Sequence, residues 1–377
     1  MLERRADMSL TLIGKRLKAL RDERGVDQDA VAAMLGVKSR QIVSNIETGE
    51  RKVKPEELLA LSKNFDVGLD YFTDPYRIVG EGSFSWRQTG RSLTDLKDFE
   101  EMAGSWIAMF RHEAPRVGRP AMLRRPRLPL TRQSSYEDAM SEGERVANEL
   151  ALGEVPAANL PNAMESVFGI LVLMVDAIDG VSGAACRLPE LDAVLVNRNE
   201  VVGRRNFDLA HELFHIMTWE QMPPDYSEAA LGFVGKRNRV EQLADNFASA
   251  LLMPKKVLER FGQWTGMGVQ ELSARINKVA DELLVTGQAL KWRLVALGLL
   301  SKAMAHDISD DLLRNNGRAR TDKEAPPLFS HAFMDVVGKA MDQGYVSKRR
   351  VAQQLGVNVN ELKGIFRDHC IAVPEGL

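Results

Sequence analysis

The strongest constraint on the fold is the segment FDLAHELFHIMTW at 207–219, in which two histidines stand four residues apart. Its apolar spacing predicts a helix, and residues i and i+4 of a helix lie on one face. His211 and His215 would then present two imidazole nitrogens to one Zn²⁺ ion, at about 2.0–2.1 Å. Glu212 would point to the side of the ion, where it is no ligand but can accept a proton from water as a general base. The alternative is an ordinary amphipathic helix whose histidines make surface contacts.

A catalytic zinc site needs a third protein ligand and an open fourth position. The segment VEQLADNFASALLMP at 240–254 predicts a second helix, which would pack on the first through an apolar stripe that includes Ala244 and Phe247. Glu241 lies at its start and is the candidate third ligand. Asp245 stands one turn later on the same face, where it could hydrogen-bond a ligating imidazole. The alternative for Glu241 is a solvent-facing residue that the helix dipole stabilises.

Together, RRNFDLAHELFHIMTW and EQLADNFASALLMP resemble the ImmA/IrrE family of zinc-dependent peptidases. The resemblance includes the phenylalanine and alanine before HExxH, the glutamate of the second helix and the closing LLMP, and it extends more weakly over 135–300. Members of the family are gluzincin-like. The resemblance therefore implies that His211, His215 and Glu241 bind Zn²⁺, that Glu212 is the catalytic base, and that the substrate is a protein, a repressor. No residue is identified for stabilising the oxyanion.

A compact helical unit is predicted for 11–73, where short apolar stripes alternate with glycine and proline turn signals. Within it, QDAVAAML and RQIVSNIE have the layout of a helix-turn-helix, in which Gly36 opens the turn and Ser39 can cap the second helix. Ile42 and Ile46 are expected to face the core. Polar side chains of the second helix are then left to read base edges, and their neighbours to contact phosphates. The candidate DNA-contacting residues are Gln28, Ser39, Arg40, Gln41, Ser44, Asn45, Arg51 and Lys52.

The segment 11–73 resembles the XRE (Cro/CI-type) DNA-binding domain. The spacing from Gly36 to the end of RQIVSNIE is one residue longer than the usual pattern, so which side chain reaches which base stays open. The resemblance implies a double-stranded DNA operator as partner, and because binding of this class is usually dimeric we expect a homodimer. Residues 1–75 carry as many acidic as basic side chains. The alternative is a helical module for protein interaction.

Composition limits the class of protein. The chain has 377 residues and a net charge of −2, so DNA binding must come from a local patch and not from bulk basicity. Two distant cysteines, Cys186 and Cys370, argue against a disulfide scaffold and fit a reducing compartment. The longest apolar run, FGILVLMV at 168–175, is too short to span a bilayer, and the N-terminus shows no secretory signal. We expect a cytoplasmic protein with no membrane association.

The length predicts several domains. The expected fold is multidomain: an all-α helix-turn-helix domain over 1–75, a linker with a helical segment and a Pro/Arg-rich stretch over 76–134, an α+β gluzincin-like peptidase domain over 135–305, and a helical C-terminal region over 306–377.

Three segments leave alternatives open. GILVLMV and DAVLVN (192–197) predict strands, and DAVLVN is either a sheet edge that receives a substrate strand or an interior core strand. The arginine-rich, proline-rich stretch at 115–132 is either a solvated linker or a supplementary contact to DNA phosphate. SKRRVAQQLGVNVNEL at 347–362 is either a helical cap or interaction element, or a second helix-turn-helix fragment.

Two kinds of function are consistent with these patterns. The first is a DNA-binding transcriptional regulator with a fused zinc endopeptidase, which cleaves a partner repressor or its own linker at 73–135 and so relieves repression. The second is a regulator or antitoxin without proteolysis, in which the metal or ligand site is sensory or structural. The intact Glu212 favours the first, because a structural metal site has no need of a general base.

Overall fold

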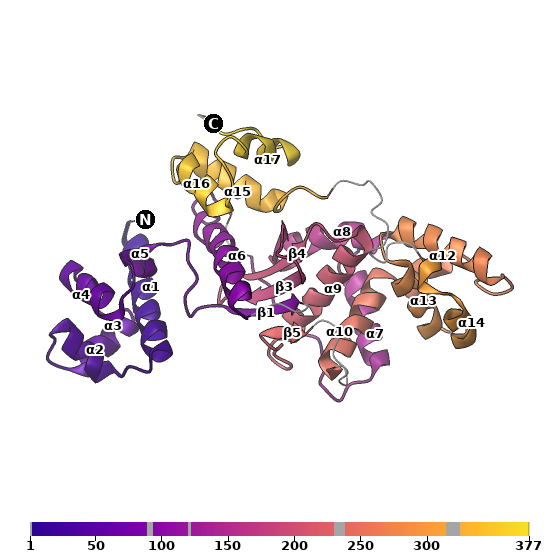
Figure 1. The fold of residues 1–377 in the computed structure, drawn as a ribbon, viewed down its shortest axis with the longest axis horizontal. Coiled ribbons are helices and arrows are strands. Elements are labelled where there is room, and N and C mark those ends of the chain that lie inside the picture. The colour runs from indigo at the N-terminus through magenta and orange to yellow at the C-terminus, as the bar shows by residue number, and fades with distance from the viewer. Residues whose placement is uncertain (1, 89–92, 120–121, 230–237, 314–324, 376) are drawn as a thin grey trace. The chain divides into compact units, whose positions relative to one another are not determined.

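The computed structural model (Figure 1) describes residues 2–88, 93–119, 122–229, 238–313, 325–375 and 377. The chain forms two compact units, one of Met1–Gly82 with Glu100–His112 and one of Ser83–Phe99 with Glu113–Leu377. Within the described ranges, no helix combines the length and the apolar character that crossing a membrane requires.

The first unit begins with five helices, as its sequence predicts. They are α1 (Leu2–Glu23), α2 (Gln28–Leu35), α3 (Arg40–Glu47), α4 (Pro55–Phe65) and α5 (Leu69–Thr73). Asp27 starts α2 by accepting a hydrogen bond from the Ala30 amide. Ser39 is the N-cap residue of α3, but its side chain makes no capping hydrogen bond, contrary to expectation. Ile46 is fully buried, as expected, and Ile42 packs against the core but is only partly buried. Val43, which was not expected in the core, is fully buried.

A buried arginine connects the two ends of this helical bundle. Arg16 on α1 donates hydrogen bonds to the backbone carbonyls of Tyr71, Asp74 and Arg77. Burial lowers the pKa of Arg16 to about 10, which still leaves the guanidinium charged at neutral pH. The carbonyls that follow α5 are thereby satisfied by a side chain from α1.

The second unit combines a five-stranded sheet with helices. Its strands are β1 (Ser83–Gln88), β2 (Leu171–Val175), β3 (Val181–Arg187), β4 (Asp192–Asn197) and β5 (Ser227–Ala229). Its helices are α7 (Tyr136–Glu149), α8 (Pro156–Ala163), α9 (Val202–Thr218), α10 (Arg239–Leu252), α11 (Lys255–Glu259), α12 (Val269–Leu283), α13 (Gly287–Ala296), α14 (Lys302–Asp307), α15 (His331–Asp342), α16 (Lys348–Leu355) and α17 (Leu362–Asp368), with a π turn at Met164–Phe168 and a 3₁₀ turn at Asp310–Leu312. Helix α6 (Leu93–Glu113) contributes residues to both units.

The sheet has the order β2-β4-β3-β1-β5. β2 pairs with β4 in parallel, β3 is antiparallel to both β4 and β1, and β5 lies parallel to β1. The segment 192–197 is therefore an interior core strand, and the interpretation of it as an edge for substrate was wrong. Strand β1 was not expected from the sequence, since its partner β3 lies about a hundred residues further along the chain.

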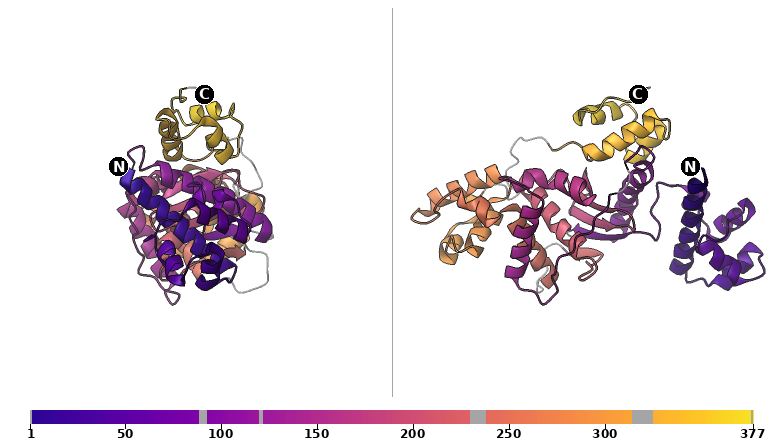
Figure 2. Two further views of the ribbon diagram at one scale, coloured as in Figure 1. Left: turned by 90° about the vertical axis from the view of Figure 1, so that its left-hand side faces the viewer. Right: turned by 180° about the vertical axis from the view of Figure 1, so that it is seen from behind.

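Helices α9 and α10 form the layer that carries the candidate site. α9 packs on β3 and β4, α10 packs on α9, and α7 packs on α10 (Figures 1 and 2). The last contact is close: a Cβ atom at Gly143 of α7 would lie 2.4 Å from the carbonyl oxygen of Phe247. Only glycine allows this approach of the two backbones.

The Pro/Arg-rich stretch is not a freely solvated linker. Arg125 pairs with the buried carboxylate of Asp192 at 2.9 Å, and Leu128 and Leu130 are buried in the main core. The Leu128 amide also donates to the carbonyl of Met217 at the end of α9. Alternating apolar residues hold this segment against the domain, a signal that the density of proline and arginine concealed.

Candidate metal centre and nucleic-acid interface

Helix α9 buries both histidines at its contact with α10. The exposed fraction is 1% for His211 and 0% for His215. Because they are four residues apart on one helix, both rings face the same side, where Glu241 approaches from the first turn of α10. Two rigid helices therefore bring three groups together, as the i, i+4 spacing predicts.

The three groups converge on a single point. Nε2 of His211 lies 3.1 Å from Nε2 of His215 and 3.1 Å from Oε2 of Glu241, and Nε2 of His215 lies 3.6 Å from Oε1 of Glu241. Ligand atoms of a tetrahedral zinc site are about 3.4 Å apart when each is about 2.1 Å from the metal. The two imidazole nitrogens and the carboxylate of Glu241 are thus separated by distances close to those between ligand atoms of such a site.

A second carboxylate sets the tautomer of His211. Oδ1 of Asp245 lies 3.0 Å from Nδ1 of His211 and accepts its proton. Nε2 of the neutral ring then carries a lone pair and faces the Glu241 carboxylate, and two acceptors at that distance need a cation or a proton between them. Two imidazoles and one carboxylate are the donor set of catalytic zinc sites, so the residues present fit such an ion.

Asp245 stays ionised in this position. Burial acts to raise its pKa, but the hydrogen bond from His211 and the nearby positive charge of Arg87 act against burial, and the pKa of Asp245 lies below its ordinary value. An ionised Asp245 accepts the Nδ1 proton and makes the opposite nitrogen of His211 a better electron-pair donor.

Glu212 lies outside the three-residue cluster and points toward the sheet. It is 1% exposed, and its Cγ and Oε1 would lie 3.8 and 3.9 Å from a Cβ atom at Gly183 of β3. A side chain at 183 would therefore press against the carboxylate. The missing side chain of Gly183 leaves room for Glu212 beside the strand.

Sequence reasoning missed an arginine that also reaches this region. Arg87 of β1 contacts Asp208, one turn before His211 on α9, with 3.0 Å between Nη1 and Oδ1. Its Nη2 lies 3.9 Å from Oδ1 of Asp245. Asp208 is 1% exposed, so its charge is compensated within the protein. The one signal in the sequence is the repetition of acidic residues at positions 208, 212, 241 and 245 of the two helices, which indicates that a basic side chain should lie nearby.

The candidate DNA-contacting residues divide into two groups. The first lies on or beside α3 with outward side chains: Ser39, Arg40, Gln41 and Lys52 are exposed, and Ser44 and Asn45 are partly exposed. Gln41 Nε2 donates to Oδ1 of Asn45 at 2.8 Å, so these two amides lie side by side on the outer face of α3.

Gln28 and Arg51 form the second group and already have partners within the domain. Gln28 donates to Glu47, which also accepts from Arg21 at 2.8 Å. Arg51 makes two hydrogen bonds to Glu57, of 2.9 and 2.7 Å. For Arg51 the structure thus shows a role in holding the start of α4, which the sequence did not suggest.

Comparison with known families assigns both parts of the chain. The helix-turn-helix family model matches residues 17–72, and the model described as the IrrE N-terminal-like domain, a peptidase family, matches residues 168–294. The chain carries a helix-turn-helix domain and an IrrE-like domain. The fusion that the sequence motifs suggested is therefore confirmed.

A curated relative matches part of the chain. The HTH-type transcriptional regulator PrpR of Mycobacterium tuberculosis is 32% identical over 112 residues, which is 29% of this chain and 21% of PrpR. The match spans about a fifth of that protein. Among solved structures, the apo form of the competence regulator ComR from Streptococcus vestibularis aligns over 89% of this chain and 99% of ComR, with 11% identity. Its TM-score of 0.17 is too low to indicate a shared fold.

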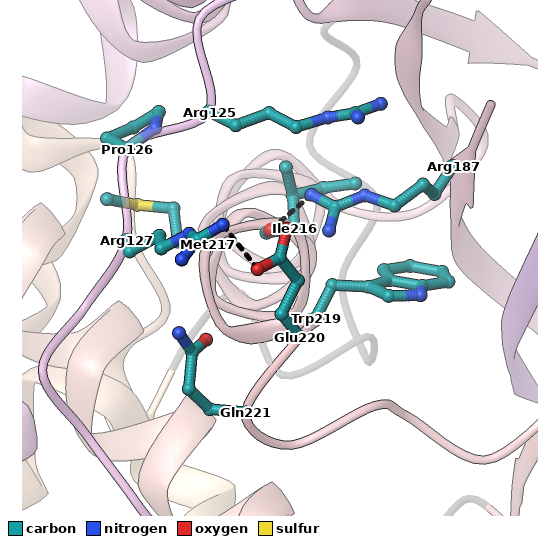
Figure 3. A pocket seen from close by; sticks show the side chains of 9 residues that line it. All are labelled: Arg125, Pro126, Arg127, Arg187, Ile216, Met217, Trp219, Glu220 and Gln221. Atoms are coloured by element: carbon teal, nitrogen blue, oxygen red, sulfur yellow. Dashed lines mark hydrogen bonds and ion pairs between the residues drawn. The ribbon is translucent and has the colours of Figure 1, made fainter. Parts of the chain in front are cut away.

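A small pocket of the IrrE-like domain lies beyond the histidines (Figure 3). Arg125, Arg127, Arg187, Trp219 and Glu220 are among the residues that line it, at the C-terminal end of α9. Each of the three arginines is paired with a carboxylate, Arg127 with Glu220 and the other two with Asp192. The pocket contains none of the converging ligand atoms and is not the metal centre.

Proposed function

We propose that this chain is a DNA-binding transcriptional regulator whose IrrE-like domain is a zinc-dependent endopeptidase. The observation that carries the proposal is the convergence of His211, His215 and Glu241 from two packed helices. Glu212 directly follows His211 on α9. A merely structural site would need a fourth protein ligand, and neither geometry nor chemistry would require a glutamate at 212.

The chain's own residues divide the work of peptide hydrolysis. His211, His215 and Glu241 would hold the ion, and Asp245 keeps His211 in the tautomer that can bind it. When bound, Zn²⁺ supplies a Lewis acid that lowers the pKa of water toward neutrality and polarises a carbonyl. Glu212 would take the proton of the attacking water and return it to the leaving amine. Because all of these groups stand on α9 and α10, their positions are set by helix packing and do not depend on a loop.

The substrate of the proposed peptidase is a repressor, either a partner protein or this chain. The helix-turn-helix domain would bring the peptidase to an operator in double-stranded DNA, as a homodimer on a two-fold site. Arg40, Gln41, Ser44 and Asn45 would read base edges. The DNA phosphates would be contacted by Gln28, Ser39, Arg51 and Lys52. Gln28 would have to give up its hydrogen bond to Glu47, and Arg51 its hydrogen bonds to Glu57. Cleavage would then relieve repression.

The decisive experiment combines metal analysis with a substitution of the base. Purified chain is expected to contain zinc and to cleave a candidate repressor in a chelator-sensitive way. Glu212→Gln should keep the metal and lose cleavage by about 10³-fold, since general acid–base catalysis contributes about 10²–10⁴-fold. Glu220→Gln is the matched control, because Glu220 pairs with Arg127 outside the cluster. Wild-type cleavage by the Glu212→Gln variant would refute the proposal.

A regulator with a structural metal is the second candidate, and the deep burial of both histidines favours it. In that case chelation should lower the melting temperature and weaken DNA binding. Derepression in cells should then be the same for Glu212→Gln as for the wild type.

A further inference from the structure

Strand β1 lies between β3 and β5, next to the candidate base. Residues 83–88 immediately follow the first compact unit in the chain, yet they belong to the second unit and pair with β3 along its length (Figures 1 and 2). In an antiparallel pair the two backbones are about 4.8 Å apart. Any other extended segment that added to β3 on this side would need the same place.

The register of β1 puts its arginine at the site. Arg87 is opposite Gly183, the position against which Glu212 packs. The Arg87 side chain extends toward α9 and α10, where it contacts Asp208 at 3.0 Å and approaches Asp245 at 3.9 Å. β1 thus places an extended backbone beside Glu212, and it places the guanidinium of Arg87 between Asp208 and Asp245.

The opposite side of β1 is held by aromatic contacts. Phe84 and Trp86 stack with their ring centroids 5.5 Å apart, and Trp86 contacts Phe99 at 5.4 Å. Trp86 is fully buried. The two faces of the strand are therefore held by a charge contact at Arg87 and by an apolar contact at Trp86. The edge of β1 that does not face β3 pairs with the short strand β5.

We propose that the side of β3 opposite β4 is the peptide-binding edge of the peptidase and that β1, which pairs there and carries β5 on its other side, occupies it as a built-in substrate mimic. The substrate class follows from this geometry: an extended segment with a basic side chain at the position of Arg87, where it meets Asp208 and Asp245. The inference rests on the proposed function. Because main-chain hydrogen bonds hold an added strand and side-chain pockets select it, β1 excludes other peptides until it leaves.

Peptide binding tests this inference without requiring turnover. The probe is a fluorescein-labelled peptide GSFSWRQ, which has the sequence of residues 82–88, and the protein is the full chain with Glu212→Gln. Adding Arg87→Gln loosens β1 and should raise the affinity for the probe at least tenfold. A probe with glutamine in place of its arginine should bind the Arg87→Gln protein at least tenfold more weakly than the original probe does. Asp208 keeps Arg204 within 3.8 Å in this variant, which helps the fold to persist.

A reversible lock provides the second arm. Ser85 and Ala185 are register partners, so their Cβ atoms are about 4.5–5.5 Å apart, near the range for a disulfide. In Ser85→Cys/Ala185→Cys, oxidation should abolish probe binding and reduction should restore it. Cys186 points to the other face of β3 and does not compete. Arg145→Gln, on the exposed surface of α7, is the control and should bind the probe as the parent does.

The outcomes separate the two proposals. The inference would be overturned if the oxidised and reduced forms of the disulfide variant bound the probe equally. It would also be overturned if Arg87→Gln did not raise the affinity for the probe while its melting temperature and metal content were unchanged. In either case β1 would be a permanent strand of the sheet. If instead Arg87→Gln binds the probe, the lock abolishes binding, and the chain with Glu212 restored cleaves no peptide, the peptidase assignment fails while the binding edge stands.

Discussion

The metal cluster and the recognition helix differ in how strongly the fold holds their side chains. His211, His215 and their carboxylate partners are held between two packed helices, and the rings are almost completely buried. Arg40 and Gln41 on α3 project into solvent, and the Gln41 amide donates to the amide oxygen of Asn45 on the same helix. Catalytic groups must be in place before the substrate binds, because bond cleavage depends on their exact positions. Side chains that read DNA can instead become ordered when the DNA binds.

Loss of one buried imidazole should give the largest effect. His215→Ala removes the proposed ligand atom that lies 3.1 Å from Nε2 of His211. We expect zinc content to fall from about one ion per chain to nearly none, and peptidase activity to vanish with it. Metal analysis by mass spectrometry measures this. His306→Ala, on a side chain that packs on Trp292, should leave the metal in place. Full metal occupancy in His215→Ala would mean that the ion, if present, binds elsewhere.

Removal of the orienting carboxylate should have a smaller effect. Asp245→Asn keeps the shape of the side chain but weakens the acceptor for the Nδ1 proton of His211. Such changes lower metal affinity by about 10–100-fold. Competition with a chromophoric chelator measures the affinity, and Asp307→Asn on the exposed α14 is the matched control. Unchanged affinity would show that helix packing alone orients the ring.

On the recognition helix the effects should be moderate and dependent on DNA sequence. Gln41→Ala should cost about 1–3 kcal/mol on the preferred operator and relax selectivity at one base pair. Lys52→Ala should weaken binding to all sequences alike and reduce the slope of log affinity against log salt by about one. Fluorescence anisotropy over a salt series separates the two. A uniform loss for Gln41→Ala would remove it from the base-reading set.

The smallest expected effect is on stability in acid. The two hydrogen bonds from Arg51 hold the pKa of Glu57 below its ordinary value of 4.5. Because the folded pKa is depressed, the contribution of this pair is present above about pH 4.5 and is lost as the pH falls through the folded pKa. Arg51→Gln should lower the free energy of unfolding by roughly 1 kcal/mol at pH 7, and the difference should shrink as the pH falls below 4.5. Urea denaturation at both pH values measures this.

The same contrast explains how much could be predicted from the sequence. Spacing of four residues places His211 and His215 together wherever a helix forms, and a second amphipathic helix with Glu241 supplies the partner. The α3 helix and the burial of Ile46 were predicted, but the full burial of Val43 was not, because Ile42 and Val43 are equally apolar and only packing decides which of them is buried more deeply. Strand β1 and Arg87 left no local signal, since their partners are Gly183 and Asp208, far along the chain.

Gly143 on α7 has a consequence for how genetic data on this protein should be interpreted. Helix α7 carries none of the converging residues, but any larger residue at 143 would push against the Phe247 carbonyl of α10. That displacement would move α10, and with it Glu241, away from the imidazoles. A screen for inactive mutants should therefore recover changes at 143 as well as changes at His211, His215 and Glu241.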